Sequence, residues 1–184
     1  VAPGFTPDAR EILAGKTNLR LLELATEAID AAGSEHVRSI LGGLLVQDLD
    51  DQLITPDEWT VATQRPPSLE ERQDLEFAWR LVRHVRSNAI VVAKSGQSLG
   101  VGAGQMNRVG SARIALDAAG EQVNGAVLAS DGFFPFDDTV RLAASRGITA
   151  VIHPGGSKRD ADSIKACDEL GLSMLLTGRR HFLH

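Results

Sequence analysis

Two adjoining segments decide the fold predicted for this chain: SNAIVVAK at residues 87–94 and GVGAGQMNR at residues 100–108. The first reads as an apolar strand, and the second as a glycine-rich strand that leads into a helix beginning near Arg108. Bare backbone beside the free N–H groups of a helix start and a cation suits an anion such as a phosphate or a carboxylate. Gln105 stands where the dinucleotide-binding fingerprint requires its third glycine, so a nicotinamide site is not expected.

Strands and helices alternate from Asn88 onward. The periodicity predicts strands over 89–93, 98–103, 126–129, 148–152 and 173–176, and helices over 109–119, 138–146 and 160–170. A glycine follows each of these helices, where a left-handed closing residue is favoured: Gly120, Gly147 and Gly171. The alternation is typical of an α/β sheet covered by helices.

A capped helix precedes this region. Pro66 and Pro67 interrupt the chain, Ser68 is a favourable N-cap, and Glu71 lies three residues later, as a capping box requires. The predicted helix spans residues 68–85. Its buried stripe is expected to consist of Leu75, Ala78, Trp79, Val82 and Val85.

The N-terminal third is less regular. Residues 7–16 are predicted to form a short helix with Pro7 in its first turn, and residues 18–24 a strand. The apolar segment 37–47 contains two consecutive glycines at 42–43. This pattern indicates a buried strand that either has a bulge at the glycines or leaves its backbone without side chains there.

Domain organisation follows from these patterns. Residues 48–67 are polar, include three prolines, and are predicted to be mostly a connection. We therefore expect a leading segment and connection over 1–67 and a main α/β lobe over 68–184. With 184 residues, 43% of them hydrophobic, the chain can bury a sizeable core. Because the first residue is Val1 rather than methionine, an upstream portion is expected.

Composition argues against several classes of function. A net charge of −5, with both signs mixed along the chain, gives no basic face for nucleic acid. Cys167 is the single cysteine, which excludes an internal disulfide and a cysteine-rich zinc site and fits a reducing cytoplasm. No apolar run approaches the roughly 20 residues that a membrane helix needs.

Three polar residues are candidates for ligand binding. Arg108 could bind a phosphate or a carboxamide oxygen in bidentate fashion, or it could be a solvated surface arginine. Asn88 could bind a carboxamide or an amine through both halves of its amide, or it could form a turn at the strand edge. Arg180 lies near the C-terminus, where a solvated tail is the simpler interpretation.

Aromatic residues cluster after the strand predicted at 126–129. Phe133, Phe134 and Phe136 are half of the six phenylalanines of the chain. Rings at the carboxyl end of a strand can stack on a planar heterocycle, and ordinary packing under the next helix explains them equally well.

These residues carry a resemblance to a known family. Residues 87–108, the motif SDGFFPF at 130–136 and the ending TGRRHFLH at 177–184 resemble the C-terminal part of the bifunctional purine biosynthesis proteins, and the resemblance runs over essentially the whole chain. In that family this part belongs to AICAR formyltransferase, which transfers a formyl group from 10-formyltetrahydrofolate to the 5-amino group of AICAR in IMP biosynthesis. The same proteins also carry an IMP cyclohydrolase.

The resemblance implies a fold, contacts and partners. The fold would be three-layer α/β/α, similar to cytidine deaminase but without zinc, because the deaminase motifs His-x-Glu and Pro-Cys-x-x-Cys are absent. The implied co-substrate is 10-formyltetrahydrofolate, with no metal required, and a cytoplasmic homodimer is expected. The implied nucleotide contacts are Asn88, Arg108, Phe133 and Arg180, and the implied folate contacts are Pro135 and Phe136.

One departure from the family limits the activity expected. Formyl transfer requires proton removal from a poorly nucleophilic amine and stabilisation of the resulting oxyanion. In the family a lysine–histidine pair in the first half of the formyltransferase region has these tasks. No Lys-His dipeptide occurs in this chain, and the N-terminal half of the enzyme is missing. We therefore expect a binding lobe with little or no turnover, and a stand-alone nucleotide- or folate-binding module is the alternative.

Overall fold

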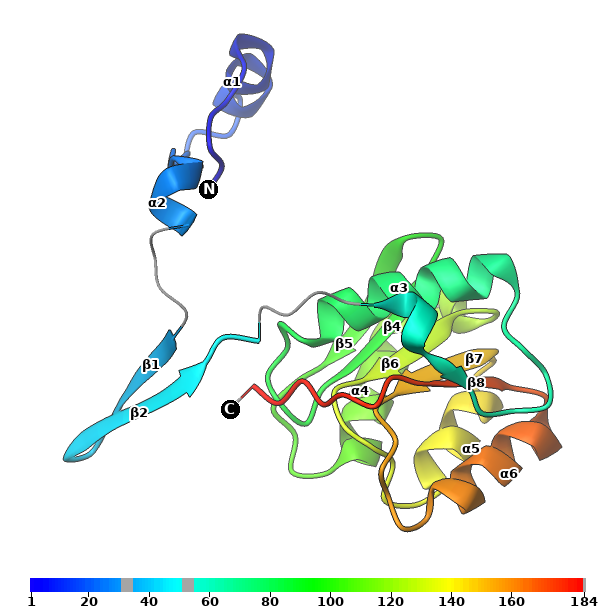
Figure 1. The fold of residues 1–184 in the computed structure, drawn as a ribbon. Coiled ribbons are helices and arrows are strands. Elements are labelled where there is room, and N and C mark those ends of the chain that lie inside the picture. Colours follow the sequence, from blue (N-terminus) through cyan, green and yellow to red (C-terminus); the bar gives the residue numbers. More distant parts are fainter. Residues whose placement is uncertain (31–34, 51–54, 184) are drawn as a thin grey trace. The chain divides into compact units, whose positions relative to one another are not determined.

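The computed structural model describes residues 1–30, 35–50 and 55–183 and contains two compact units, Val1–Asp51 and Gln52–His184. The first unit contains α1 (Pro7–Ala14), α2 (Thr26–Asp30), β1 (Glu35–Ile40) and β2 (Gly43–Asp48) (Figure 1). The strands of the second unit are β3 (Thr60–Val61), β4 (Ile90–Lys94), β5 (Gln97–Gly102), β6 (Val127–Ser130), β7 (Ala150–His153) and β8 (Ser173–Leu176). Its α-helices are α3 (Leu69–Val82), α4 (Arg108–Ala119), α5 (Asp138–Ser145) and α6 (Asp160–Leu170). Two 3₁₀ helices, at Pro56–Glu58 and Gly120–Val123, also belong to this unit.

A six-stranded mixed sheet organises the second unit. The strand order is β3-β8-β7-β6-β4-β5. Strands β6, β7 and β8 are parallel, whereas β4 runs antiparallel to both β5 and β6, and β3 runs antiparallel to β8. The predicted α/β class is confirmed, and the strands and helices predicted from residue 89 onward all form, with ends shifted by no more than two residues.

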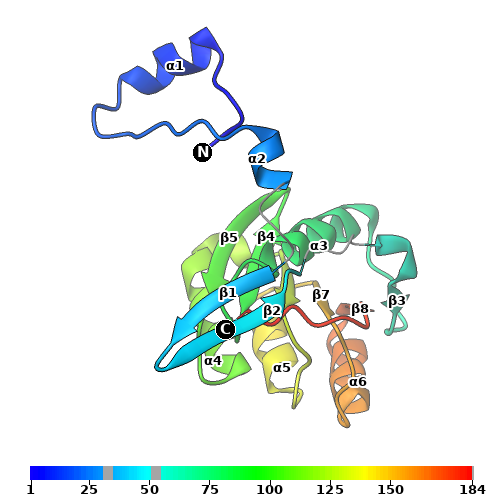
Figure 2. The ribbon, with the colours of Figure 1, turned by 60° about the vertical axis from the view of Figure 1, so that its left-hand side comes forward.

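Alternate residues of the central strands pack on opposite faces of the sheet, as the two-residue period of a strand requires. Val91 and Ile152 belong to a buried cluster with Trp79 of α3. Val92 and Val151 belong to the other buried cluster, with residues of α4, α5 and α6. Figures 1 and 2 show α3 on one face of the sheet and the other three helices on the opposite face.

Helix α3 begins as its sequence predicts. The Ser68 hydroxyl accepts a hydrogen bond from the Glu71 N–H (3.2 Å), and the Glu71 carboxylate accepts one from the Ser68 N–H (2.8 Å). The helix ends at Val82, three residues before the predicted end. Val85 follows it and still packs against the same cluster as the rest of the predicted stripe.

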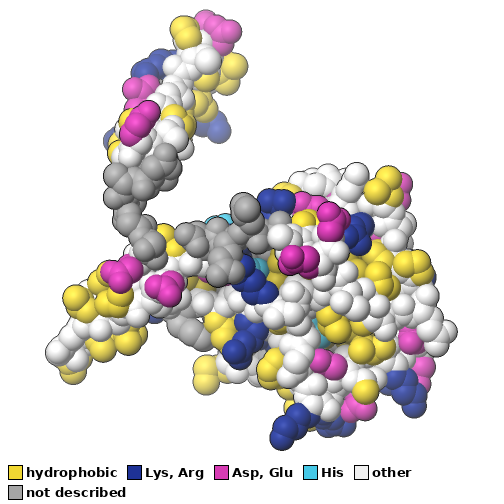
Figure 3. All heavy atoms as spheres, viewed as in Figure 1, with side chains coloured by type: hydrophobic (Ala, Val, Ile, Leu, Met, Phe, Trp, Pro, Cys, Tyr) yellow, Lys and Arg dark blue, Asp and Glu magenta, His cyan; other side chains and the backbone are white. Residues whose placement is uncertain are grey.

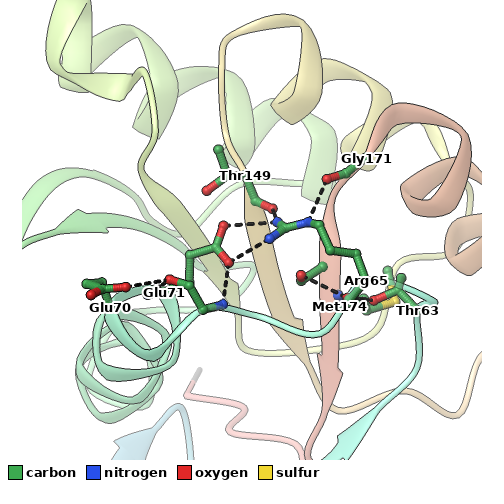
Figure 4. A network of polar contacts seen from close by, with 9 residues as sticks. Thr63, Arg65, Glu70, Glu71, Thr149, Gly171 and Met174 are labelled. Atoms are coloured by element: carbon green, nitrogen blue, oxygen red, sulfur yellow. Dashed lines mark hydrogen bonds and ion pairs between the residues drawn. The ribbon is translucent and has the colours of Figure 1, made fainter.

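The predicted connection contributes to the second unit. Strand β3 pairs with β8, and Arg65 holds the segment after it in place (Figure 4). Its guanidinium makes two hydrogen bonds to the Glu71 carboxylate, each 2.9 Å long, and donates to the carbonyl oxygens of Thr149 and Gly171. Partial burial raises the pKa of Glu71, but hydrogen bonds from Arg65 and from the Ser68 backbone outweigh it and hold that pKa below its usual value.

The described part of that connection therefore includes a strand and a structural ion pair. Residues 51–54, which also fall within the predicted connection, lie outside the described residues, as does His184.

The first unit departs from the sequence prediction in two places. Residues 18–24 form no strand, and their one ladder contact is a bridge between Glu23 and Ala2. The segment 37–47 is an antiparallel β-hairpin rather than one buried strand. Its glycines mark a turn instead of a bulge, because Gly42 adopts a φ of 81°, which a two-residue hairpin loop favours.

The hairpin is also exposed rather than buried. Every residue of β1 and β2 is exposed, and no described side chain of the first unit is buried, over residues 1–28 and 35–50. Hydrophobic side chains are visible along the hairpin in Figure 3. A two-stranded sheet has no layer of its own to cover it, so apolar residues alone do not make its strands a core.

Candidate functional site

A pocket of about 290 Å³ lies in the second unit where four segments meet. This volume is at the low end for a small-molecule site. The segments are the residues before β4, the start of α4 with the loop before it, the loop after β6, and the C-terminal segment. The lining residues are Asn88, Met106, Asn107, Arg108, Phe133, Pro135 and Phe182.

Four of the six predicted contact residues therefore line one pocket, namely Asn88, Arg108, Phe133 and Pro135. Phe136 does not line it; its ring is half exposed, with the Arg159 guanidinium 5.0 Å from the ring centroid. Arg180 does not line it either, but its guanidinium lies over the ring of Phe182, which does.

Arg108 is held beneath the pocket by an ion pair with Asp131. Its Nη1 donates to Asp131 and to Ser130 Oγ (2.8 Å), and its Nη2 donates to Asn88 Oδ1 (2.9 Å). Only 6% of the residue is exposed, so the interpretation of a solvated arginine is wrong. Because Asp131 balances its charge, Arg108 does not give the pocket a net positive charge, although two of its five N–H donors remain for a ligand.

The amide of Asn88 is oriented by partners on both sides. Oδ1 accepts from Arg108, and Nδ2 donates to the carbonyl oxygen of Gln105 (2.9 Å). The backbone oxygen of Asn88 accepts from Ser111 Oγ (2.9 Å), and the peptide bond before Asn88 is cis. One N–H and one acceptor site of the amide remain available to a ligand.

The Asp131 carboxylate joins the strands below the pocket. It is fully buried and accepts hydrogen bonds from the backbone N–H of Ala89 (3.1 Å), the Ser87 hydroxyl and Arg108. All three donors belong to the protein, and one of them is the Arg108 guanidinium. Asp131 therefore serves to hold the loop and Arg108 in place.

The glycines of β5 were predicted to leave bare backbone for an anionic ligand, but the structure gives them a different role. A Cβ at Gly100 would lie 2.0 Å from the carbonyl oxygen of Ala115, and one at Gly102 would lie 1.9 Å from that of Ser111. Both oxygens belong to α4, so these glycines let the helix pack directly on the strand. The glycine that leaves room for pocket residues is Gly132, where a Cβ would lie 2.6 Å from Arg108 Nη2 and 2.7 Å from Phe182 Cε1.

The phenylalanine cluster divides between the two interpretations. Phe133 is partly exposed and lines the pocket, as a stacking residue would. Phe134 is fully buried, and its ring centroid lies 4.5 Å from that of His153. Phe134 is therefore a core residue and Phe133 a candidate contact, because successive residues of the loop point in different directions.

His153 is a buried, structural residue behind this loop. Its Nδ1 accepts a hydrogen bond from the Gly155 N–H (3.0 Å), and Nε2 lies 3.3 Å from the sulfur of Met174. Burial, with a smaller contribution from the charge of Arg108, lowers the pKa of His153 to about 3. The ring is therefore neutral at physiological pH.

The C-terminal segment folds back onto the body of the unit (Figure 1). The His181 N–H donates to the carbonyl oxygen of Asp131 (3.0 Å), and Leu183 exchanges hydrogen bonds with Ser87 through its N–H (3.0 Å) and its carbonyl oxygen (2.8 Å). The interpretation of a solvated tail is wrong for residues 181–183. The side chain of Arg180 itself is exposed.

No ligand contact was predicted for three of the lining residues, Met106, Asn107 and Phe182. Among these three, Phe182 is the one that lies outside the glycine-rich segment. No periodic pattern surrounds it, and its role depends on where the last segment returns. Over the described ranges of the chain, no group of three or more His, Cys, Asp or Glu side chains is arranged to hold a metal ion. Over the same ranges, no helix combines the length and the apolar character needed to cross a membrane.

Comparison with known sequences gives consistent matches. The family model described as "AICARFT/IMPCHase bienzyme" matches residues 1–118. The chain is 86% identical over its whole length to the bifunctional purine biosynthesis protein PurH of Synechococcus sp. (strain CC9902) and 62% identical to that of Prochlorococcus marinus (strain MIT 9211). It covers 35% and 36% of these two proteins, so it spans about a third of the length of the curated relatives it matches.

Similarity to solved structures is weak. Acinetobacter baumannii RibD, form 2, matches 58% of this chain and 34% of its own with 17% sequence identity and a TM-score of 0.39. This match does not bear on function.

Proposed function

Because the chain belongs to the AICARFT/IMPCHase bienzyme family, we propose that it is the part of an AICAR formyltransferase that binds the nucleotide. The reaction is transfer of a formyl group from 10-formyltetrahydrofolate to the 5-amino group of AICAR, a step of purine biosynthesis. The observation that carries the proposal is the convergence of Asn88, Arg108 and Phe133 on one pocket.

The chemistry of these side chains matches an imidazole carboxamide. The free N–H and acceptor site of the Asn88 amide can pair with a carboxamide, which presents the complementary groups. The ring of Phe133 can stack on a planar imidazole. Arg108 orients Asn88 and keeps two N–H donors for a carboxamide oxygen. Arg180 is an exposed cation whose guanidinium lies over the ring of the pocket residue Phe182, and it is the proposed partner of the nucleotide phosphate.

The folate is proposed to lie on the side of Pro135 and Phe136. Both side chains are exposed, and Pro135 lines the pocket beside Phe133. A folate placed there would bring its N10-formyl group next to the amine that receives it. The cytidine-deaminase-like three-layer arrangement, the homodimer and the cytoplasmic location belong to the same proposal.

Binding without turnover is the expected behaviour of this chain. No Lys-His dipeptide is present. Two titratable groups near the pocket are already engaged: Asp131 by Arg108, and His153 in the protein interior. We therefore expect proton removal from the amine to come from residues elsewhere in the functional enzyme.

Calorimetry with AICAR tests the proposal. The chain should bind AICAR, either alone or after addition of the upstream part of a PurH relative, and Asn88→Ala should weaken binding by about tenfold, the order of a lost hydrogen-bonding pair. Arg159→Ala, outside the pocket, is the control and should leave the affinity unchanged. Equal affinities for wild type and Asn88→Ala would refute the assignment of the pocket.

Two further outcomes distinguish a lobe from a complete module. Tight binding to the chain alone favours the stand-alone module, and binding that requires the upstream part favours the lobe. A steady-state rate for the chain alone that equals the rate of a full-length PurH relative would contradict the assignment of proton transfer to other residues.

A further inference from the structure

Phe182 lines the pocket and also contacts the exposed guanidinium of Arg180. Its ring lines the pocket. The Arg180 Cζ atom lies 5.3 Å from the centroid of the same ring. One aromatic side chain therefore contacts both the ligand space and the cation proposed to meet a phosphate.

The backbone around Phe182 fixes where its ring can go. His181, on one side, donates its N–H to the carbonyl oxygen of Asp131. Leu183, on the other side, is bonded to Ser87 through both its N–H and its carbonyl oxygen. With both neighbouring residues anchored, the ring of Phe182 can turn only about its own side-chain bonds.

Gly132 provides the space that the ring occupies. A Cβ at this position would lie 2.7 Å from Phe182 Cε1, which is closer than side-chain carbons pack. The ring therefore lies directly against the backbone of the loop after β6, and 39% of the residue remains exposed. This backbone contact gives Phe182 a rigid base on the side away from solvent.

A rigid ring is a useful platform for an exposed arginine. A free arginine side chain has several rotatable bonds, and ordering it upon ligand binding opposes affinity. A guanidinium over an aromatic face is held by cation–π attraction, while its N–H groups remain available at its edge for an oxyanion. Within residues 1–30, 35–50 and 55–183, no carboxylate forms an ion pair with Arg180, in contrast to Arg108.

We propose that Phe182 is a positioning residue that holds Arg180 at the rim of the pocket for an anionic group of the ligand, the phosphate of a nucleotide. The inference rests on the proposed function for the identity of the ligand, but the contact between the two side chains exists without it. Loss of the ring should therefore weaken recognition of the phosphate specifically.

The first test needs no ligand. In the ¹⁵N-labelled chain, the Nε–Hε signal of Arg180 should carry an upfield ring-current shift. Phe182→Ala should abolish the shift, and Phe182→Tyr should keep it. An Arg180 signal that is identical in wild type and Phe182→Ala would overturn the proposal, whatever the chain binds.

The second test compares AICAR with its dephosphorylated nucleoside by calorimetry, under the conditions in which wild type binds. The ratio of the two affinities measures recognition of the phosphate. Phe182→Ala should reduce that ratio roughly two- to fivefold, the fold-change expected for an exposed cation–π contact, and Phe182→Tyr should restore it. Arg159→Ala removes another exposed, ring-stacked arginine of equal charge and should leave the ratio unchanged.

A double variant that combines Phe182→Ala with Arg180→Ala distinguishes a positioning role from general destabilisation of the chain. If Phe182 acts through Arg180, then Phe182→Ala adds nothing to the effect of Arg180→Ala on the ratio. Additive losses, or an unchanged ratio in Phe182→Ala, would contradict the inference. If wild type binds neither compound in any arrangement, the proposed function fails, and the ring-current measurement still decides whether Phe182 positions Arg180.

Discussion

Strand β4 of the second unit and strand β2 of the first have similar apolar sequences, IVVAK and GLLVQD, but different surroundings. The first four residues of β4 are fully buried, since β5 and β6 flank the strand and helices cover both of its faces. Strand β2 pairs with β1 alone, and all its residues are exposed. Burial is thus a property of the neighbours that a strand acquires, and the same apolar residue has different energetic weight in the two units.

The largest expected difference concerns the ion pairs. Asp131→Asn leaves the charge of Arg108 buried without a partner, so we expect the free energy of unfolding to fall by about 3–5 kcal/mol. The matched change in the first unit is Glu23→Gln in the half-exposed pair Arg10–Glu23, which should cost less than about 1 kcal/mol. Urea denaturation followed by circular dichroism measures both, and equal losses would contradict the contrast between the units.

The loss of stability on replacing a strand glycine by alanine should differ nearly as much between the two units. Gly102→Ala places a Cβ against the backbone of α4 and forces the helix away from β5, for an expected loss of about 3 kcal/mol. Gly43→Ala, in β2, meets no atom within 4 Å and should change the free energy of unfolding by less than about 0.5 kcal/mol. Thermal denaturation of the two variants provides the comparison, and a tolerated Gly102→Ala would show that α4 does not pack as described.

Acid should destabilise the second unit through His153. Its pKa is lowered to about 3 in the folded chain, below the 6.5 of an unfolded chain. The unfolded state therefore binds more protons between these values, and stability falls as pH falls below about 6.5, by about 2 kcal/mol on reaching pH 5.

The variant His153→Asn isolates this effect. It should be less stable at pH 7, since it loses ring packing, yet its stability should fall less steeply between pH 6.5 and 5. Both tryptophans, Trp59 and Trp79, belong to the second unit, so their fluorescence during urea unfolding reports on it. Parallel pH profiles for wild type and variant would rule out His153 as the source.

The smallest expected difference in stability is between the same substitution, Val→Thr, at one valine in each unit. Val91→Thr buries a hydroxyl in the core beside α3 and should cost about 1–2 kcal/mol. Val46→Thr, on the exposed hairpin, should cost less than about 0.5 kcal/mol. The two values come from the same urea titration. A cost at Val46 equal to that at Val91 would show that the hairpin is covered in solution.

Local signals in the sequence predicted much of the second unit. The capping box of Ser68 and Glu71 depends on four consecutive residues, and the alternating strands and helices depend on periods of two and 3.6 residues, so neither needs distant partners. The same local rules failed at the hairpin, because they cannot tell an apolar strand with neighbours from one without.

The sequence by itself determined the α/β class and the positions of most elements after residue 68. Its resemblance to a known family grouped six contact residues, of which Asn88, Arg108, Phe133 and Pro135 line one pocket. Only the tertiary structure decided that Gly100 and Gly102 serve helix packing, that Asp131 neutralises Arg108, and that Phe182 completes the pocket. Each of these depends on contacts between segments far apart in the chain, and the partner in such a contact is fixed by the three-dimensional path of the backbone, which no short window of sequence contains.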